Sequence, residues 1–157
     1  MKGEPKVIEY LIAGLRHELT AVNQYWLHYR LLDHWGYKAL AEYWRKESIE
    51  EMEHADDLMV RIIFLEGCPR MQLDPLHIGK TVTNILECDL RLELAARAPD
   101  EEAATYCHAV RDYVSRHLFE KLMHEEEHID FLETQLNLVD KLGLQLYAQH
   151  HIGTMDD

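Results

Sequence analysis

Two segments of the chain repeat the same pair of metal-binding side chains. Glu51 and His54, and likewise Glu125 and His128, stand three positions apart. On an α-helix this spacing places both side chains on one face, where they can reach the same ion. With 18 glutamates and 11 histidines in 157 residues, chance alone produces about one such pair, so the motif needs further support.

The support comes from two more glutamates, which make the repeat longer. The first set is Glu18, Glu51 and His54, and 74 or 75 positions later it recurs as Glu93, Glu125 and His128. A buried, unpaired carboxylate is costly, whereas four glutamates with two divalent cations form a neutral cluster. Mixed carboxylate and imidazole ligation favours iron or manganese over structural zinc. The alternative is that these residues are surface acids on well-solvated helices.

The elements that must position these side chains are helices. Apolar residues recur at alternating spacings of three and four, and no strand pattern is present. Pro99 should kink or break the third helix, because proline cannot donate the helical hydrogen bond. We expect long helices over about residues 5–34, 38–65, 81–97 and 112–141, helix resuming from about 101, and a short helix over about 144–152.

The segment 66–80 holds two glycines and two prolines, which indicates a long connection and not a tight turn. In a four-helix bundle a long crossover joins parallel neighbours. The predicted fold class is therefore all-α. We expect residues 1–157 to form a single domain, with a four-helix bundle over about 5–142, a short fifth helix and a polar tail.

Composition excludes several classes of protein. The formal charge is −13, from 29 acidic and 16 basic side chains, which argues against binding to nucleic acid. The chain has no secretory leader and no apolar run that could span a membrane. Cys68, Cys88 and Cys107 are odd in number and form no CxxC motif. We therefore expect a protein of the reducing cytoplasm.

The chain resembles the bacterioferritin family, which is haem-containing and ferritin-like, from Met1 to about Gln149. The matching segments are residues 6–11 (KVIEYL), 21–25 (AVNQY), 47–56 (ESIEEMEHAD), 64–67 (FLEG), 112–115 (DYVS) and 128–136 (HIDFLETQL). The resemblance implies a ferritin-like four-helix bundle with a long crossover.

The same resemblance implies an iron-storage ferroxidase. Its di-iron ligands would be Glu18, Glu51, His54, Glu93, Glu125 and His128, with Glu51 and Glu125 bridging the two irons. Fe(II) would be oxidised with O2 or H2O2, and ferric mineral would be stored inside a shell of twenty-four subunits. Tyr25, on the face of Glu18, would hydrogen-bond or donate an electron near the site; the alternative is a core tyrosine.

The resemblance further implies a b-type haem shared by two subunits about a two-fold axis. Met52 would be the axial ligand from each subunit, and the haem would pass electrons, from a ferredoxin or reductase, for iron release. The residues expected to line the haem pocket are Leu19, Val22, Asn23, Trp26, Ile49 and Ala55.

The chain departs from the family pattern at four positions. One is Glu53, where many members have lysine or another residue, which alters the charge near the expected haem. Lys46 and Glu50 replace a histidine and an aspartate that bind iron on the inner surface in some members, so we do not expect that site here. Phe131 replaces a tryptophan, which removes one candidate electron donor. Two alternative functions stay open: a di-iron peroxidase or oxygenase on the same bundle, and a haem-binding structural subunit of a mixed shell.

Overall fold

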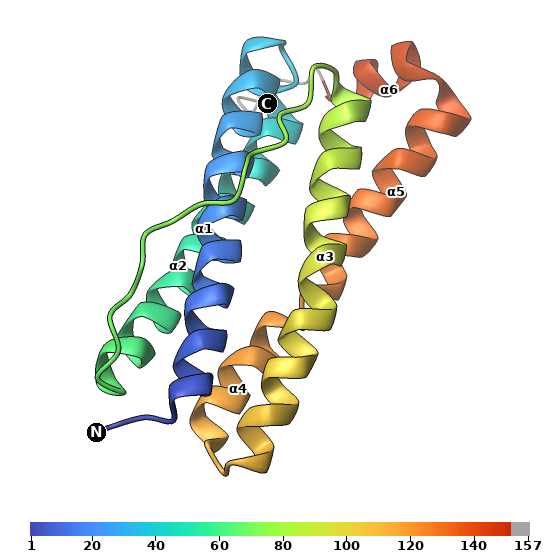
Figure 1. Cartoon of the computed structure of the whole chain (residues 1–157). Coiled ribbons are helices and arrows are strands. Elements are labelled where there is room, and N and C mark those ends of the chain that lie inside the picture. The colour runs from blue at the N-terminus through green and yellow to red at the C-terminus, as the bar shows by residue number, and fades with distance from the viewer. Residues whose placement is uncertain (152–157) are drawn as a thin grey trace.

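The computed structural model of the chain describes residues 1–151, which form six helices and no strand. This confirms the all-α, ferritin-like prediction. Residue 152, the expected end of the last helix, and the expected polar tail lie outside the described residues. The helices are α1 (Pro5–His34), α2 (Lys38–Phe64), α3 (Val82–Ala109), α4 (Tyr113–Leu122), α5 (Glu126–Leu142) and α6 (Leu144–His151) (Figure 1).

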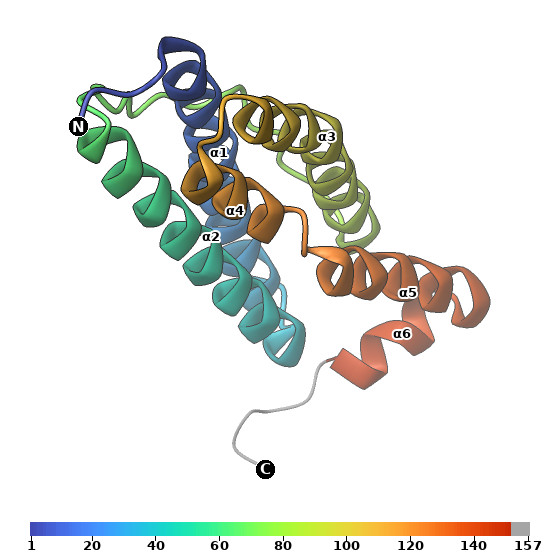
Figure 2. The same cartoon turned by 90° about the horizontal axis from the view of Figure 1, so that it is seen from below.

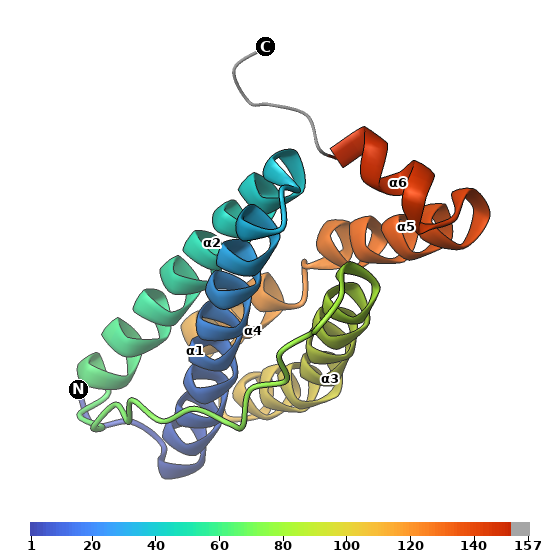
Figure 3. The ribbon, with the colours of Figure 1, turned by 90° about the horizontal axis from the view of Figure 1, so that it is seen from above.

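The helices form two pairs. The α1 and α2 helices pack along their lengths, and α3 packs against both α4 and α5, which follow one another. Views from below and from above show the two groups facing each other, with the short α6 beside α5 at one end (Figures 2 and 3). None of the helices in the described part of the chain combines the length and the apolar character that a membrane span requires.

A tight turn at Gly36 joins α1 to α2, where the positive φ of 93° suits a residue without a Cβ. The connection from α2 to α3 is instead an extended crossover that runs along the bundle (Figure 1). It makes α2 and α3 run in the same direction, as the length of the connection predicts. The expectation that they are neighbours is wrong, because α3 packs against α1 and not along α2.

A row of polar side chains on α1 binds the crossover. Thr20, Gln24 and His28 recur every four residues, so they lie in one row along the helix. Backbone N–H groups of the crossover donate to this row, from Asp74 to Thr20 Oγ1 (2.9 Å), from His77 to Gln24 Oε1 (3.0 Å) and from Gly79 to His28 Nε2 (2.9 Å). These bonds satisfy donors on a segment that has no secondary structure of its own.

Two hydrophobic clusters make up the core. One contains Leu15, Leu58 and Phe119, and the other contains Tyr25 and Trp44. Glu18 lies in α1 between residues of the first cluster and residues of the second. The buried acids of the repeat thus lie between the two hydrophobic clusters.

The expected break of the third helix at Pro99 is wrong. The α3 helix continues through Pro99 to Ala109. An interior proline costs about 3 kcal/mol because it removes one hydrogen bond and crowds the preceding turn. The residues beyond it, Ala103, Ala104 and Cys107, are buried in the first core cluster, and this packing offsets the cost.

The single fourth helix expected over 112–141 is also wrong. The chain makes two helices, α4 and α5, separated by a turn over residues 123–125. Asp112 caps α4 by accepting a hydrogen bond from the N–H of Ser115. The turn brings Glu125, which is the N-cap residue of α5, close to buried carboxylates, and repulsion between like charges opposes a regular helix there.

Candidate metal centre

The six repeated glutamates and histidines converge in the middle of the bundle. Each long helix supplies part of the set, and Glu125 comes from the turn between α4 and α5. Glu18 and Glu51 keep only 4% and 2% of their surface exposed. Glu93 and His128 are buried as well, while His54 and Glu125 are partly buried. Burial on this scale contradicts the surface-acid alternative.

The first half of the repeat is compact. His54 Nδ1 lies 3.8 Å from a carboxylate oxygen of Glu18 and 3.7 Å from one of Glu51. The same nitrogen lies 3.4 Å from Glu125 Oε1. One donor atom from each of Glu18, Glu51 and His54 falls within 4.8 Å of the others, a separation that suits shared coordination of one ion.

The second half is arranged differently. His128 Nε2 lies 3.6 Å from Glu93 Oε1, but Glu125 extends towards His54 and not towards His128. A second compact group, with donor atoms within 4.8 Å of one another, is formed by Glu47, Glu51 and Glu125. Glu51 belongs to both groups and thus lies between the two prospective metal positions.

Glu47 is a site residue that the sequence analysis did not assign. It is buried one helical turn before Glu51, and its Oε2 lies 3.4 Å from His128 Nδ1. The signal was present, because Glu47 falls on the same apolar stripe of its helix as Glu51 and His54. Nothing in the sequence alone, however, brings it to His128.

Burial and mutual repulsion change the acidity of the cluster. Burial, followed by the neighbouring carboxylates, raises the pKa of Glu18 and of Glu47 to about 8. Burial is also the main reason why the pKa values of Glu51, Glu93 and Glu125 are raised. Burial lowers the pKa of His128 to about 4. Without a cation, the site therefore favours neutral groups.

Five donor atoms of the cluster are buried without a hydrogen-bond partner. They are Glu18 Oε2, Glu47 Oε2, Glu51 Oε1, His54 Nδ1 and His128 Nε2. Buried polar atoms of folded proteins are nearly always paired, because an unpaired one carries its full desolvation cost. Carboxylate oxygens and imidazole nitrogens that face one another in this way fit a divalent transition metal, which would bind all of them.

Two tyrosines flank the cluster. The Tyr25 hydroxyl donates a hydrogen bond to Glu93, as one of the expected roles requires, and burial raises the pKa of Tyr25 well above its ordinary value. Tyr43, which the sequence analysis did not assign, places its hydroxyl 3.1 Å from His128 Nδ1. Its ring is stacked on Phe131 with 3.6 Å between the ring centroids.

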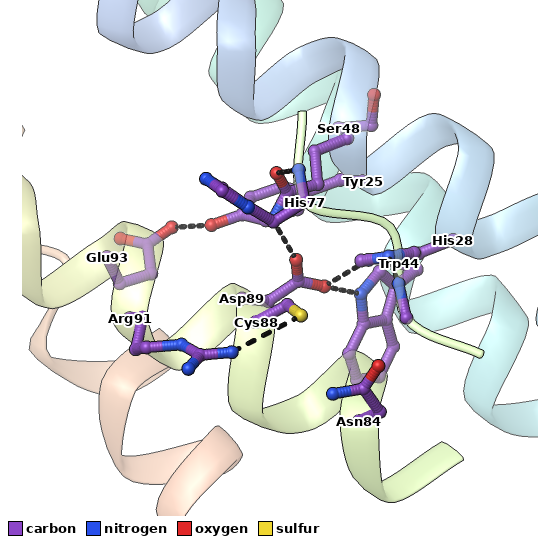
Figure 4. A network of polar contacts seen from close by, with 12 residues as sticks. Tyr25, His28, Trp44, Ser48, His77, Asn84, Cys88, Asp89, Arg91 and Glu93 are labelled. Carbon is purple, nitrogen blue, oxygen red and sulfur yellow. Dashed lines mark hydrogen bonds and ion pairs between the residues drawn. The ribbon is translucent and has the colours of Figure 1, made fainter. Parts of the chain in front are cut away.

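A buried polar network lies one turn away from the cluster (Figure 4). Asp89 accepts hydrogen bonds from Gln24 Nε2 (2.8 Å) and Trp44 Nε1 (2.6 Å). It also accepts one from His28 Nδ1 (2.8 Å), which carries the proton because Nε2 of that ring accepts from Gly79. This network ties α1, α2, α3 and the crossover together one helical turn from Glu93.

A separate apolar cavity of about 570 Å³ lies on the outer face of α1 and α2. Met52 is at its edge with 44% of its surface exposed. Four residues expected at a haem pocket line it, namely Val22, Asn23, Trp26 and Ile49. Leu19 and Ala55 do not line this cavity, because both point into the first core cluster. Lys46 and Glu50 are exposed elsewhere on α2.

Comparison with known proteins agrees with this fold. Residues 8–142 match the family model of the Ferritin-like domain. A bacterioferritin from Brucella melitensis is 55% identical over 159 residues, covering 100% of this chain and 99% of the relative. A bacterioferritin from Rhodobacter capsulatus is 52% identical over 158 residues, covering 99% of this chain and 98% of the relative.

The solved structure of the Rhodobacter capsulatus protein superposes with a TM-score of 0.96 at 52% identity, covering 100% of this chain and 99% of that one. That structure is described as having a metal-free dinuclear site and a haem iron in a crystallographic special position. The fold and the match to the family model show that the chain is a protein of the ferritin-like class. Within that class, the chain belongs to the bacterioferritin family.

Proposed function

We propose that this protein is an iron-storage ferroxidase. Its substrates are Fe(II) and O2 or H2O2, and its ferric product is stored as mineral inside an oligomeric shell of its own subunits. The observation that carries the proposal is the set of five unpaired donor atoms buried in the middle of one chain. The family of the chain supports it, since relatives over the full length are bacterioferritins.

The first compact group of donor atoms, together with the 3.6 Å approach of His128 Nε2 to Glu93 Oε1, suggests how two Fe(II) ions bind. Glu18 and His54 would hold one ion, and Glu93 and His128 the other, with Glu51 and Glu125 between them. Four carboxylates balance the charge of two divalent ions, which a buried site requires. Bound iron supplies the electrons that reduce the oxidant.

The protein's own residues prepare this chemistry. The apolar clusters on either side exclude bulk water, which strengthens every electrostatic interaction in the site. Tyr25 donates a hydrogen bond to the carboxylate of Glu93, and the Asp89 network links the helices around it. Glu47, with a pKa of about 8, keeps its proton at neutral pH and can exchange it as the nearby ligands ionise.

The cavity beside Met52 supports the haem part of the proposal. A thioether on a partly exposed helix face, next to an apolar hollow, fits one axial ligand of a haem that a second copy of the chain completes. Such a haem would carry electrons towards the stored mineral. A visible spectrum of the purified protein, with Met52→Leu as the comparison, tests this part independently of iron oxidation.

The ferroxidase part is tested by Fe(II) oxidation. Glu18→Ala and His128→Ala should slow the rapid phase by at least about tenfold, because each removes one ligand from a closed set. Glu87→Ala is the matched control, since Glu87 is exposed on α3. Rapid oxidation that is unchanged in both ligand variants would refute the assignment.

A further inference from the structure

Two neighbouring cavities open between α1 and α3. The inner one is lined by Glu18, Glu51, Glu93 and Glu125, and so it is part of the metal cluster. The outer one has a volume of about 340 Å³ and is lined by residues of α1, α3, the crossover and α4. Three residues line both cavities: His17, Ala96 and Asp100. They therefore form the boundary between the outer cavity and the metal ligands.

Asp100 is the most unusual of the three. Its exposed fraction is 7%, no residue that the structure describes forms a hydrogen bond or ion pair with its carboxylate, and its oxygens keep some accessible surface where it lines the two cavities. A buried carboxyl group without a partner is destabilising, so a fold that retains one invites a functional explanation. Asp100 interacts electrostatically with Glu18 and with Glu125, one ligand from each half of the site.

Other donor atoms surround the same boundary. His17 lines the inner and outer cavities, and Asp74 of the crossover lines the outer one. Pro99 has no N–H to offer the carbonyl of Ala95, four residues earlier in α3, and both of these residues also line the outer cavity. Carboxylate, carbonyl and imidazole groups are ligands suited to a divalent cation such as Fe(II).

We propose that Asp100 and His17 form a transfer site for divalent cations, which receives Fe(II) from the outer cavity and releases it to the ligand cluster. This proposal rests on the proposed function, because the cluster must be the destination of the ion. The site is occupied only in passage. It supplies a carboxylate where the two cavities meet. The other residues that line the outer cavity are mainly alanine, proline and aromatic side chains, together with Arg16, which donates a hydrogen bond to Gln72.

The test uses Co(II), which binds without being oxidised, and follows its visible absorption by stopped flow on the assembled, metal-free protein. Asp100→Asn removes the charge and keeps the shape, and Glu101→Gln is the control on the exposed side of the same helix. We expect Asp100→Asn to slow Co(II) association by about tenfold while the final number of ions per chain is unchanged. His17→Gln should slow it to a smaller extent.

Two outcomes would overturn the transfer site. Association of Asp100→Asn within twofold of the unmodified chain shows that the charge has no role in the route. A lower final stoichiometry shows that Asp100 is instead a permanent ligand. A folding defect is recognised separately, because Asp100→Asn removes a buried charge and should leave the melting temperature of the metal-free protein unchanged or raised. If the unmodified chain binds no Co(II), the proposed function fails, and not this inference alone.

Discussion

The two halves of the candidate metal centre have the same residues in sequence but not the same geometry. In the first half His54 faces three carboxylates, and its helix is unbroken through Glu51. In the second half the helix is interrupted at Glu125, and His128 lies between Glu93 and Glu47. The two halves therefore repeat the types of ligand but not their surroundings. We expect the two metal positions to differ in affinity.

The largest effect should come from the residue common to both groups. Glu51→Ala removes a carboxylate that lies within 4.8 Å of the donor atoms of both compact groups. Since both metal positions lose a ligand, we expect binding of both ions to weaken by about 100-fold. An anaerobic Co(II) titration measures this, with the exposed Glu53→Ala as control. Retention of two tightly bound ions would contradict the shared position of Glu51.

The histidines should separate the two halves. His54→Ala removes contacts with three carboxylates, whereas His128→Ala removes its contact with one ligand of the repeat, Glu93. We expect the first variant to weaken the tighter Co(II) ion by about 100-fold and the second to weaken the looser ion by about tenfold. Equal effects of the two variants on the same ion would remove the proposed asymmetry.

Glu47 should affect only the second half. Glu47→Gln keeps the size of the side chain but replaces the carboxyl group 3.4 Å from His128 Nδ1 with an amide that cannot ionise. We expect the looser ion to weaken by about fivefold and the tighter ion to be unchanged, because Glu47 has no place in the group of Glu18 and His54. The exposed Glu50→Gln is the control on the same helix. A larger loss at the tighter ion would place Glu47 in the first half.

A separate effect concerns the stability of the metal-free protein between pH 6.5 and 8. Glu18 and Glu47 have folded pKa values of about 8, well above their ordinary value, so the folded state retains protons that the unfolded state releases. Their contribution is present at low pH and is lost as pH rises through 8, by at most about 1.4 kcal/mol per pH unit for each group. His128, lowered to about 4, acts only below pH 6.5.

Calorimetry at fixed protein concentration checks this dependence. The melting temperature of the metal-free protein should fall by several degrees from pH 6.5 to pH 8, and Glu18→Gln combined with Glu47→Gln should flatten the slope. Saturation with Co(II) should abolish it as well, because bound ligands are ionised at both pH values. A melting temperature of the metal-free protein that rises over this range would contradict the assignment of raised pKa values.

Much of the fold was predictable because it depends on local patterns. Apolar periodicity located the long helices, and the length of the segment before Val82 indicated the crossover. Pro99 and the turn at Glu125 were not predictable, since each depends on tertiary context: packing of Ala103 and Ala104 maintains α3, and crowding of carboxylates disfavours a regular helix at Glu125.

The same distinction between local sequence patterns and tertiary contacts applies to the residues of the site. Six ligands were recognisable from their spacing and from the resemblance to a family. The approach of Glu47 to His128 and the positions of Tyr43 and Asp100 were not, because each depends on how the other helices pack.

The most direct test of the central claim is an anomalous difference map of crystals soaked with Fe(II) and measured at the iron absorption edge. The account predicts two peaks within each chain, one beside Glu18 and His54 and one beside Glu93 and His128, with Glu51 and Glu125 between them. The absence of iron from this cluster in soaked crystals, or a single peak beside Glu47 alone, would contradict it.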